Sequence, residues 1–216
     1  MAIKTQSAAV TITAPNMVTA VFRIVGNAPY VQLRFPQKAQ ALMRAKMEKG
    51  SQAKKGAKRD PRDFQEDYKQ AMYTSTEGWH GIPAPVFRNA MISACRIVGF
   101  QMTKAKLAVF CEADGMDKDD ATPMIIINGT PEAVEHHVRN ATGVADLRVR
   151  AMWREWSAVV RLRFDADMFS LDDITNLLAR VGTQVGIGEG RPDSKQSAGM
   201  GWGTFDIAAQ APEVDK

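Results

Sequence analysis

The amino-acid sequence predicts an α+β fold, and three observations support this prediction. Residues 17–25 and residues 160–164 alternate as half-buried strands do. Apolar residues spaced three and four apart follow at residues 85–98 and 170–181, as an amphipathic helix requires. A last extended segment, residues 202–207, lies near the end of the chain. Strand, helix and returning strand near each end of the chain indicate a ferredoxin-like βαββαβ core.

The first third of the chain begins with the strand at residues 17–25, which ends in a turn at Gly26. A short extended piece follows at residues 29–35. Residues 37–50 contain no β-branched residue and many good helix formers, so we expect a helix there. Residues 51–62 have no apolar periodicity, which predicts a mobile loop. One or two further helical turns are expected at residues 63–72.

In the middle third, the helix at residues 85–98 is followed by a predicted strand at residues 106–112 and an acidic turn at residues 114–120. Residues 123–128 contain an uninterrupted apolar run, which predicts a short buried strand. Residues 130–140 are expected to form a short helix.

The last third contains one more alternating segment, residues 147–154, which places Arg148, Arg150 and Arg154 on one face of a strand. Ser170 is a typical N-cap for the helix that follows, and Gly182 is expected to end that helix. Six glycines between residues 186 and 203 predict a loop before the final strand.

Composition places the chain among ordinary globular proteins. It has 216 residues, of which 45% are apolar and 24% charged, so we expect a single domain over residues 1–216. The start of the sequence has no apolar signal-peptide core, and no apolar run is long enough for a membrane helix. Cys95 and Cys111 form no closely spaced pair and are expected to be reduced core thiols. We therefore expect a cytoplasmic protein without membrane contact.

The motifs that bind cofactors and metals are incomplete. Gly186–Gly190 is followed by Arg191, which breaks the dinucleotide-binding pattern, and the segment 190–195 is one residue short of a phosphate-binding P-loop. His80, His136 and His137 have no cysteine at zinc-ligand spacing. The acidic turn lacks the central glycine and terminal glutamate of a calcium loop. The sequence thus predicts no cofactor and no metal.

The charge of the chain is concentrated in one segment. The formal net charge is +4. Residues 37–72 hold 10 basic and 5 acidic residues, which leaves 18 basic and 19 acidic residues for the rest of the chain. This basic helical and loop insertion follows the first strand. The central cations of the insertion are Lys54, Lys55, Lys58 and Arg59. We expect them to close over a nucleic-acid strand. A solvated, lysine-rich helical hairpin would have the same composition.

Two further segments have residues suited to phosphate binding. In the glycine-rich loop, Arg191 and Lys195 provide cationic donors and Trp202 provides a stacking face. That loop would equally suit simple packing against a helix. A Gly-Ile-Pro turn after His80 leads into the helix whose first turns contain Arg88 and Asn89, and a helix start with a nearby cation is an anion site.

Together these two segments resemble the RAMP superfamily, which includes the backbone subunits of CRISPR effector complexes. Its members have an I-P-G-S-S-[LF]-[KR]-G-A-[LM]-R segment at a helix start and a glycine-rich loop before the last strand of a ferredoxin-like core. Residues 82–91 (I-P-A-P-V-F-R-N-A-M) are similar to the first pattern, with Asn89 in place of its second glycine, and residues 186–205 are similar to the second. The resemblance covers most of the chain outside the insertion. The chain is also similar to single-gene proteins of tailed bacteriophages.

The resemblance implies a non-enzymatic protein that binds single-stranded nucleic acid, RNA in preference to DNA. It also implies that copies assemble side by side along a strand or into a ring. On this hypothesis phosphates lie on main-chain amides near Gly188, Gly190 and Gly201. The cations beside them are Arg88, Arg191 and Lys195, and Trp202 stacks on a base.

Two alternatives remain open at the level of sequence. Some RAMP proteins cleave RNA with a histidine base, and His80 with Arg88 could supply a base and a cation for metal-free cleavage. The chain could instead be a structural phage component, or a protein that binds a host factor, without any nucleic acid.

Overall fold

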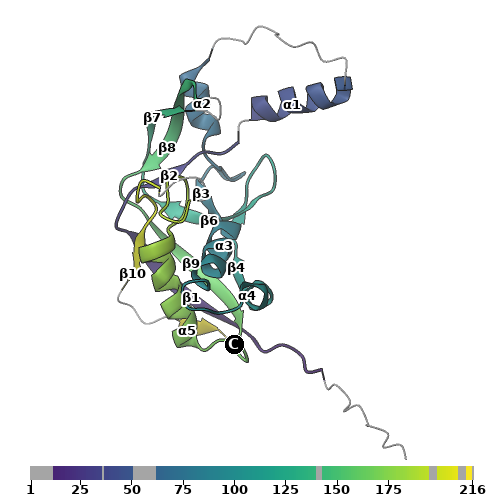
Figure 1. The fold of residues 1–216 in the computed structure, drawn as a ribbon, viewed down its shortest axis with the longest axis vertical. Helices are drawn as coiled ribbons and strands as arrows, with labels where there is room; N and C mark the ends of the chain where they lie inside the picture. Colours follow the sequence, from purple (N-terminus) through teal and green to yellow (C-terminus); the bar gives the residue numbers. More distant parts are fainter. Residues whose placement is uncertain are drawn as a thin grey trace, which may run out of the picture.

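The computed structural model describes residues 12–35, 37–50, 62–139, 143–194, 199–208 and 213–215. It is a mixed α/β structure built on antiparallel sheets (Figure 1). The larger sheet has the strand order β10-β1-β9-β6-β3, formed by Phe205–Ile207, Met17–Gly26, Ser157–Asp165, Pro123–Asn128 and Gly81–Pro83. Three short strands extend it: β11 (Glu213–Asp215) pairs with β1, β4 (Val109–Glu112) with β9, and β5 (Gly115–Met116) with β6.

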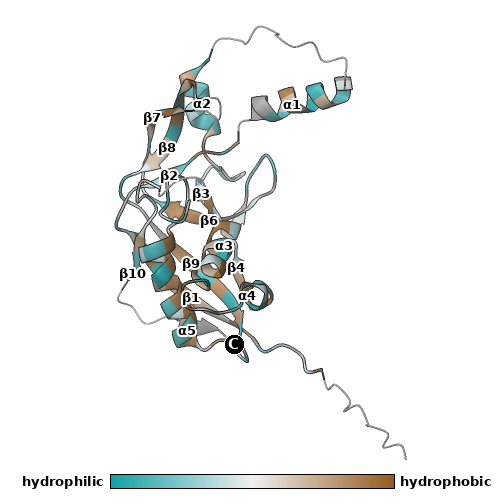
Figure 2. Ribbon diagram, viewed as in Figure 1, coloured by the Kyte–Doolittle hydropathy of each residue, from teal (hydrophilic) through white to brown (hydrophobic). Residues whose placement is uncertain are grey.

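Strands β1 and β9 form the centre of this sheet. They pair antiparallel from Met17 opposite Asp165 to Val25 opposite Ser157. Alternate residues along both strands are buried, among them Phe22 on β1. Figure 2 shows the apolar residues gathered on these central strands. The alternation in the sequence therefore marks the side of the sheet that faces the core.

Helices cover the buried side of the sheet. They are α3 (Ala84–Ala94), α4 (Met102–Ala108) and α5 (Leu171–Arg180), and α3 lies beside α5 (Figure 1). Ser170 and Asp173 form a capping box that begins α5, in which each side chain accepts a hydrogen bond from the main-chain amide of the other. Helix α5 continues into a wider π turn, Val181–Val185, that ends at Gly186.

A second sheet has the order β2-β8-β7, formed by Tyr30–Gln32, Ala145–Trp153 and Pro131–Arg139. Helix α2 (Phe64–Gln70) packs against β8 and begins at the N-cap Asp63. Helix α1 (Gln37–Lys49) projects away from the two sheets in Figure 1, with its Leu42 and Met47 side chains largely exposed.

Several expected elements are confirmed. The strands at residues 17–25, 123–128 and 160–164 are present, as are the helices at residues 37–50 and 170–181. Residues 51–61, which include the four central cations of the insertion, lie outside the described residues.

Four expectations about local structure are wrong. Residues 130–140 are not a helix, because β7 forms a ladder of nine residue pairs with β8. Residues 106–108 belong to α4, so only the second half of the expected strand at residues 106–112 exists as β4. Helix α3 ends four residues early, at Ala94. Gly182 does not stop α5; a Cβ at this residue would overlap the carbonyl oxygen of Phe205, so the glycine allows β10 to approach the π turn.

The arginine face expected on residues 147–154 is only partly exposed. Arg150 is buried, and its guanidinium donates to a carboxylate oxygen of Glu189 at 2.7 Å. Neither cysteine forms a disulfide, and Cys95 is buried. Burial raises the pKa of the Cys111 thiol to about 12. Within the described ranges, no helix has the length and apolar character needed to cross a membrane.

Candidate nucleic-acid interface

The glycine-rich loop connects the π turn to β10 and has an unusual backbone. All six of its glycines have positive φ angles, between 69° and 78°. Residues with a Cβ rarely adopt this conformation, so the sequence requirement for glycine here is conformational. At Gly188 there is also no space, because a Cβ would lie 2.6 Å from the Tyr30 ring and from the Val31 carbonyl oxygen. The loop therefore packs closely against β2.

Two acidic side chains anchor the loop to the body of the protein. Asp193 accepts hydrogen bonds from the Ser93 hydroxyl at 2.5 Å and from one guanidinium nitrogen of Arg96, which lies 2.7 and 2.8 Å from its two oxygens, and these contacts tie the loop to α3. Glu189 accepts from the buried Arg150, which ties the loop to β8. Partial burial favours the neutral form of Asp193, but Ser93 and Arg96 outweigh it and lower its pKa.

Main-chain hydrogen bonds complete the attachment of the loop. The amide of Glu189 donates to the Val31 carbonyl at 2.9 Å, and the amide of Gly203 donates to the Pro29 carbonyl at 2.8 Å. Among the hydrogen bonds of the described residues, none is donated by the amides of Gly188, Gly190 or Gly201. The loop is thus held in place while these three donors remain available.

Trp202 lies within the same loop and is half-buried. Its ring covers Gly190, where a Cβ would meet the ring at 2.5 Å, and its centroid lies 5.0 Å from that of the His136 ring on β7. Burial, together with the charge of Arg150, lowers the pKa of His136. Sequence reasoning missed the place of His136 in this site, because residues 130–140 were expected to be helical.

The cations expected beside the loop have different positions. Arg191 donates from one guanidinium nitrogen to the Gly188 carbonyl at 3.0 Å and is half-exposed. Lys195 lies outside the described residues. The structure therefore brings Arg191, Trp202 and the three glycine amides together in one loop.

Arg88 and Asn89 lie elsewhere, on the first turns of α3. The Arg88 guanidinium donates to the carbonyls of Val109, at 3.0 Å, and Lys106, and it lies 4.9 Å from the centre of the Phe110 ring. Its hydrogen-bonding capacity is thus partly used at the edge of β4. Asn89 is exposed.

His80 is half-buried immediately before β3. Its Nδ1 lies 3.2 Å from the Thr74 hydroxyl, and its ring packs edge-on against Trp153. Burial lowers the pKa of His80. The hydrogen bonds and ring contacts of His80 thus lie with Thr74 and Trp153, whereas those of Arg88 lie at the edge of β4.

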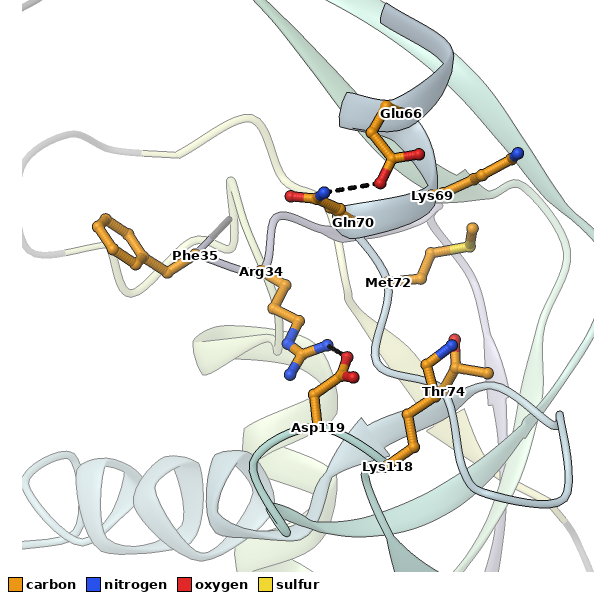
Figure 3. Close-up of a pocket in the computed structure, with 9 residues that line it drawn as sticks. All are labelled: Arg34, Phe35, Glu66, Lys69, Gln70, Met72, Thr74, Lys118 and Asp119. Atoms are coloured by element: carbon orange, nitrogen blue, oxygen red, sulfur yellow. Dashed lines mark hydrogen bonds and ion pairs between the residues drawn. The ribbon is translucent and has the colours of Figure 1, made fainter. Parts of the chain in front are cut away.

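The structure also reveals a cavity of about 240 Å³ that sequence reasoning did not identify (Figure 3). It lies between α2, the segment after β2 and the turn after β5. Its lining includes Arg34, Phe35, Gln70, Met72, Thr74 and Lys118.

Beside this cavity, the buried Arg34 side chain is the centre of an ionic cluster. Its guanidinium lies 2.7 Å from both Asp117 and Asp119 and 3.2 Å from Asp120, and it lies over the Tyr73 ring. The Asp117 side chain has no exposed surface. No group of three histidine, cysteine or acidic side chains in the described part of the chain is arranged to hold a metal ion.

Comparison with known proteins gives structural matches only. No protein-family model matches the chain. No curated protein matches it either. Among solved structures, the chain is similar to one in the cryo-EM structure of the type III-B Cmr-beta bound to cognate target RNA, with 9% sequence identity and a TM-score of 0.45. The match covers 93% of this chain and 61% of that one, so this protein spans less than two thirds of the length of that chain.

Proposed function

We propose that the protein binds single-stranded nucleic acid, RNA in preference to DNA, without cleaving it, and that its copies assemble along a strand or into a ring. The observation that carries this proposal is a set of three main-chain amides that donate no hydrogen bond among the described residues. They belong to Gly188, Gly190 and Gly201, in a loop that is anchored at both ends. Main-chain amides displayed by positive-φ residues form concave anion sites, and phosphates are the anions that a nucleic-acid strand offers in series.

The neighbouring side chains suit the same ligand. Arg191 lies beside these amides and retains donors for a phosphate. The Trp202 ring covers Gly190 and lies against the His136 ring, and bases stack on such aromatic side chains whatever their sequence. The proposal also includes five cations that add positive charge near the strand: Lys195 and the insertion residues Lys54, Lys55, Lys58 and Arg59. Arg88 and Asn89 contribute little to phosphate binding on this proposal, because the Arg88 guanidinium already donates to main-chain carbonyls at the edge of β4.

The order of elements supports the fold that this function requires. Strand β1, helix α3, strands β4 and β9, helix α5 and strand β10 follow one another as a βαββαβ core would, and β4 pairs with β9 beside β1 and β10. We therefore take the larger sheet as ferredoxin-like, in line with the resemblance to the RAMP superfamily. That resemblance also supports RNA as the strand and side-by-side assembly of copies.

Binding is tested by fluorescence anisotropy with labelled uridine and thymidine 20-mers between 50 and 300 mM salt. We expect nearly sequence-independent binding whose log–log slope against salt is about −0.7 for each neutralised phosphate. RNA should bind more tightly than DNA of the same sequence. Affinity that does not change with salt, or no affinity for any 20-mer, would overturn the proposal.

The loop itself is tested by a matched pair of charge substitutions. Arg191→Gln should weaken binding and reduce the salt slope by about 0.7, the contribution of one phosphate. Arg180→Gln removes an equal charge at the end of α5, where Arg180 contacts Gln184, and should leave the slope unchanged. Equal effects of the two substitutions would show that only net charge matters.

Assembly is tested by light scattering of the protein with and without a 60-mer RNA. The proposal expects particles whose mass rises with the length of RNA supplied. A complex of one protein per RNA at all lengths would remove the assembly part of the proposal and leave binding in place.

A further inference from the structure

The cavity lies at the base of the basic insertion. Phe35, on one wall, lies two residues before the start of the insertion at residues 37–72, and α2, on another wall, is the last helix of that insertion. Both ends of the most basic segment of the chain therefore start from the walls of this cavity.

The size and walls of the cavity suit a flat ring. Its volume of about 240 Å³ is below the roughly 300–1,000 Å³ of pockets that enclose drug-sized ligands, so it has room for one ring system and little more. Met72 forms an apolar wall and is almost fully buried, and Phe35 lies at the open side with 52% of its surface exposed. An exposed ring beside a cavity is available to stack on a planar ligand.

Polar groups around the cavity include both donors and acceptors. Gln70 donates to Glu66 from its amide nitrogen at 2.7 Å, which fixes the direction of its carbonyl oxygen. Lys118 provides an ammonium group on the opposite side, near Thr74 (Figure 3). A phosphate needs donors alone, whereas the edge of a nucleobase presents donors and acceptors together. This mixed lining therefore fits a base better than a phosphate.

The wall formed by Arg34 is rigid. Its side chain is buried against Asp117 and Asp119, and its main-chain amide donates to the Ala71 carbonyl at 3.0 Å. These bonds hold the segment after β2, the end of α2 and the acidic turn at fixed positions. A site with walls of this kind is formed before its ligand arrives, which lowers the entropic cost of binding.

We infer that this cavity accepts one nucleobase of the bound strand, which stacks on Phe35 and is contacted at its edge by Gln70 and Lys118. The inference rests on the proposed function, because the strand delivers the base. It adds a contact to the base itself, separate from the phosphate contacts of the glycine-rich loop.

The test compares a uridine 20-mer with an abasic 20-mer that has the same number of phosphates. Wild-type protein should bind the uridine strand more tightly. Phe35→Ala should reduce this preference by about tenfold while leaving affinity for the abasic strand unchanged, because the substitution removes one base–aromatic stack. Phe64→Ala is the matched control: Phe64 is an exposed phenylalanine at the start of α2 outside the cavity lining, and its loss should not change the preference.

A second variant protects the test against a folding defect. Gln70→Ala should alter the relative affinities for uridine, cytidine and adenosine 20-mers, with Lys104→Ala on α4 as a control. Thermal unfolding identifies variants that fold. An unchanged base preference in both folded cavity variants, or an equal loss of affinity for base-containing and abasic strands, would overturn the inference while leaving nucleic-acid binding intact. If wild-type protein binds neither strand, the proposed function fails first, and the inference fails with it.

Discussion

The guanidinium of Arg34 forms ion pairs with three carboxylates, and its side chain is almost inaccessible to solvent. Its side chain is 6% exposed and that of Asp117 is fully buried. Removing one partner of such a group leaves a buried charge uncompensated, which costs far more than an exposed ion pair contributes. The cluster joins segments that are distant in sequence, so the sequence pattern around residue 34 could not predict it.

Arg34→Ala should therefore lower the free energy of unfolding by about 3 kcal/mol, measured by urea denaturation. The matched control is Arg44→Ala. Arg44 pairs with Glu48 one helical turn away, but its side chain is 83% exposed, so its loss should cost less than about 0.5 kcal/mol. Similar losses for the two variants would show that the cluster is not important for stability.

Asp193 connects the glycine-rich loop to α3, and its lowered pKa gives that contact a pH dependence. Although burial opposes ionisation, the Ser93 and Arg96 contacts place the folded pKa below the ordinary value of about 3.9. The ionised group therefore stabilises the fold above about pH 4, and this contribution is lost as the pH falls through the folded pKa. Asp193→Asn should destabilise the protein clearly at about pH 6 and less at about pH 2.5. A difference between the two proteins that is constant with pH would contradict this assignment.

The strands and helices differ in how much of their structure is local. Strand β9 and helix α5 have clear periodicity and a capping residue, so they could be predicted from sequence alone. Strand β7 could not, because its residues suit a helix or a strand and its pairing with β8 decides between them. The same pairing places His136 against Trp202, which is why that contact was also missed.

The π turn after α5 depends on one glycine. At Gly182 a Cβ would overlap the carbonyl oxygen of Phe205, whereas a Cβ at Gly99 would have no neighbouring atom within 4 Å. Gly182→Ala should lower the free energy of unfolding by at least about 2 kcal/mol, because β10 or the turn must move. Gly99→Ala has only the positive-φ cost of about 1 kcal/mol. Urea denaturation of both variants measures the difference, and a smaller loss at Gly182 would mean that β10 shifts freely.

At the scale of the whole molecule, the candidate site combines segments that the sequence analysis treated separately. Its glycine-rich loop was predictable, because glycines at this density have few structural uses other than positive φ. Its anchors were not, because Arg96, Arg150 and Asp193 meet only after α3, β8 and the loop have packed. The cavity likewise forms from residues before, within and far beyond the insertion.

The distribution of charge leads to a last prediction. Residues 37–72 have a balance of +5, and the rest of the chain has a balance of −1. If the insertion supplies the phosphate contacts of the strand, deleting residues 51–58 removes Lys54, Lys55 and Lys58 and should reduce the salt slope of binding by about 2.

The fold should tolerate this deletion, because the two sheets and the helices that cover them lie outside it, so the melting temperature should stay within a few degrees. The control is a triple glutamine variant of three exposed cations outside the insertion: Arg23, Lys104 and Lys106. Both variants lose three positive charges, and only the deletion loses them from the insertion. An equal reduction in slope would mean that nucleic acid responds to the net charge of the whole surface, and a reduction only in the control would move the phosphate contacts to the sheet and α4.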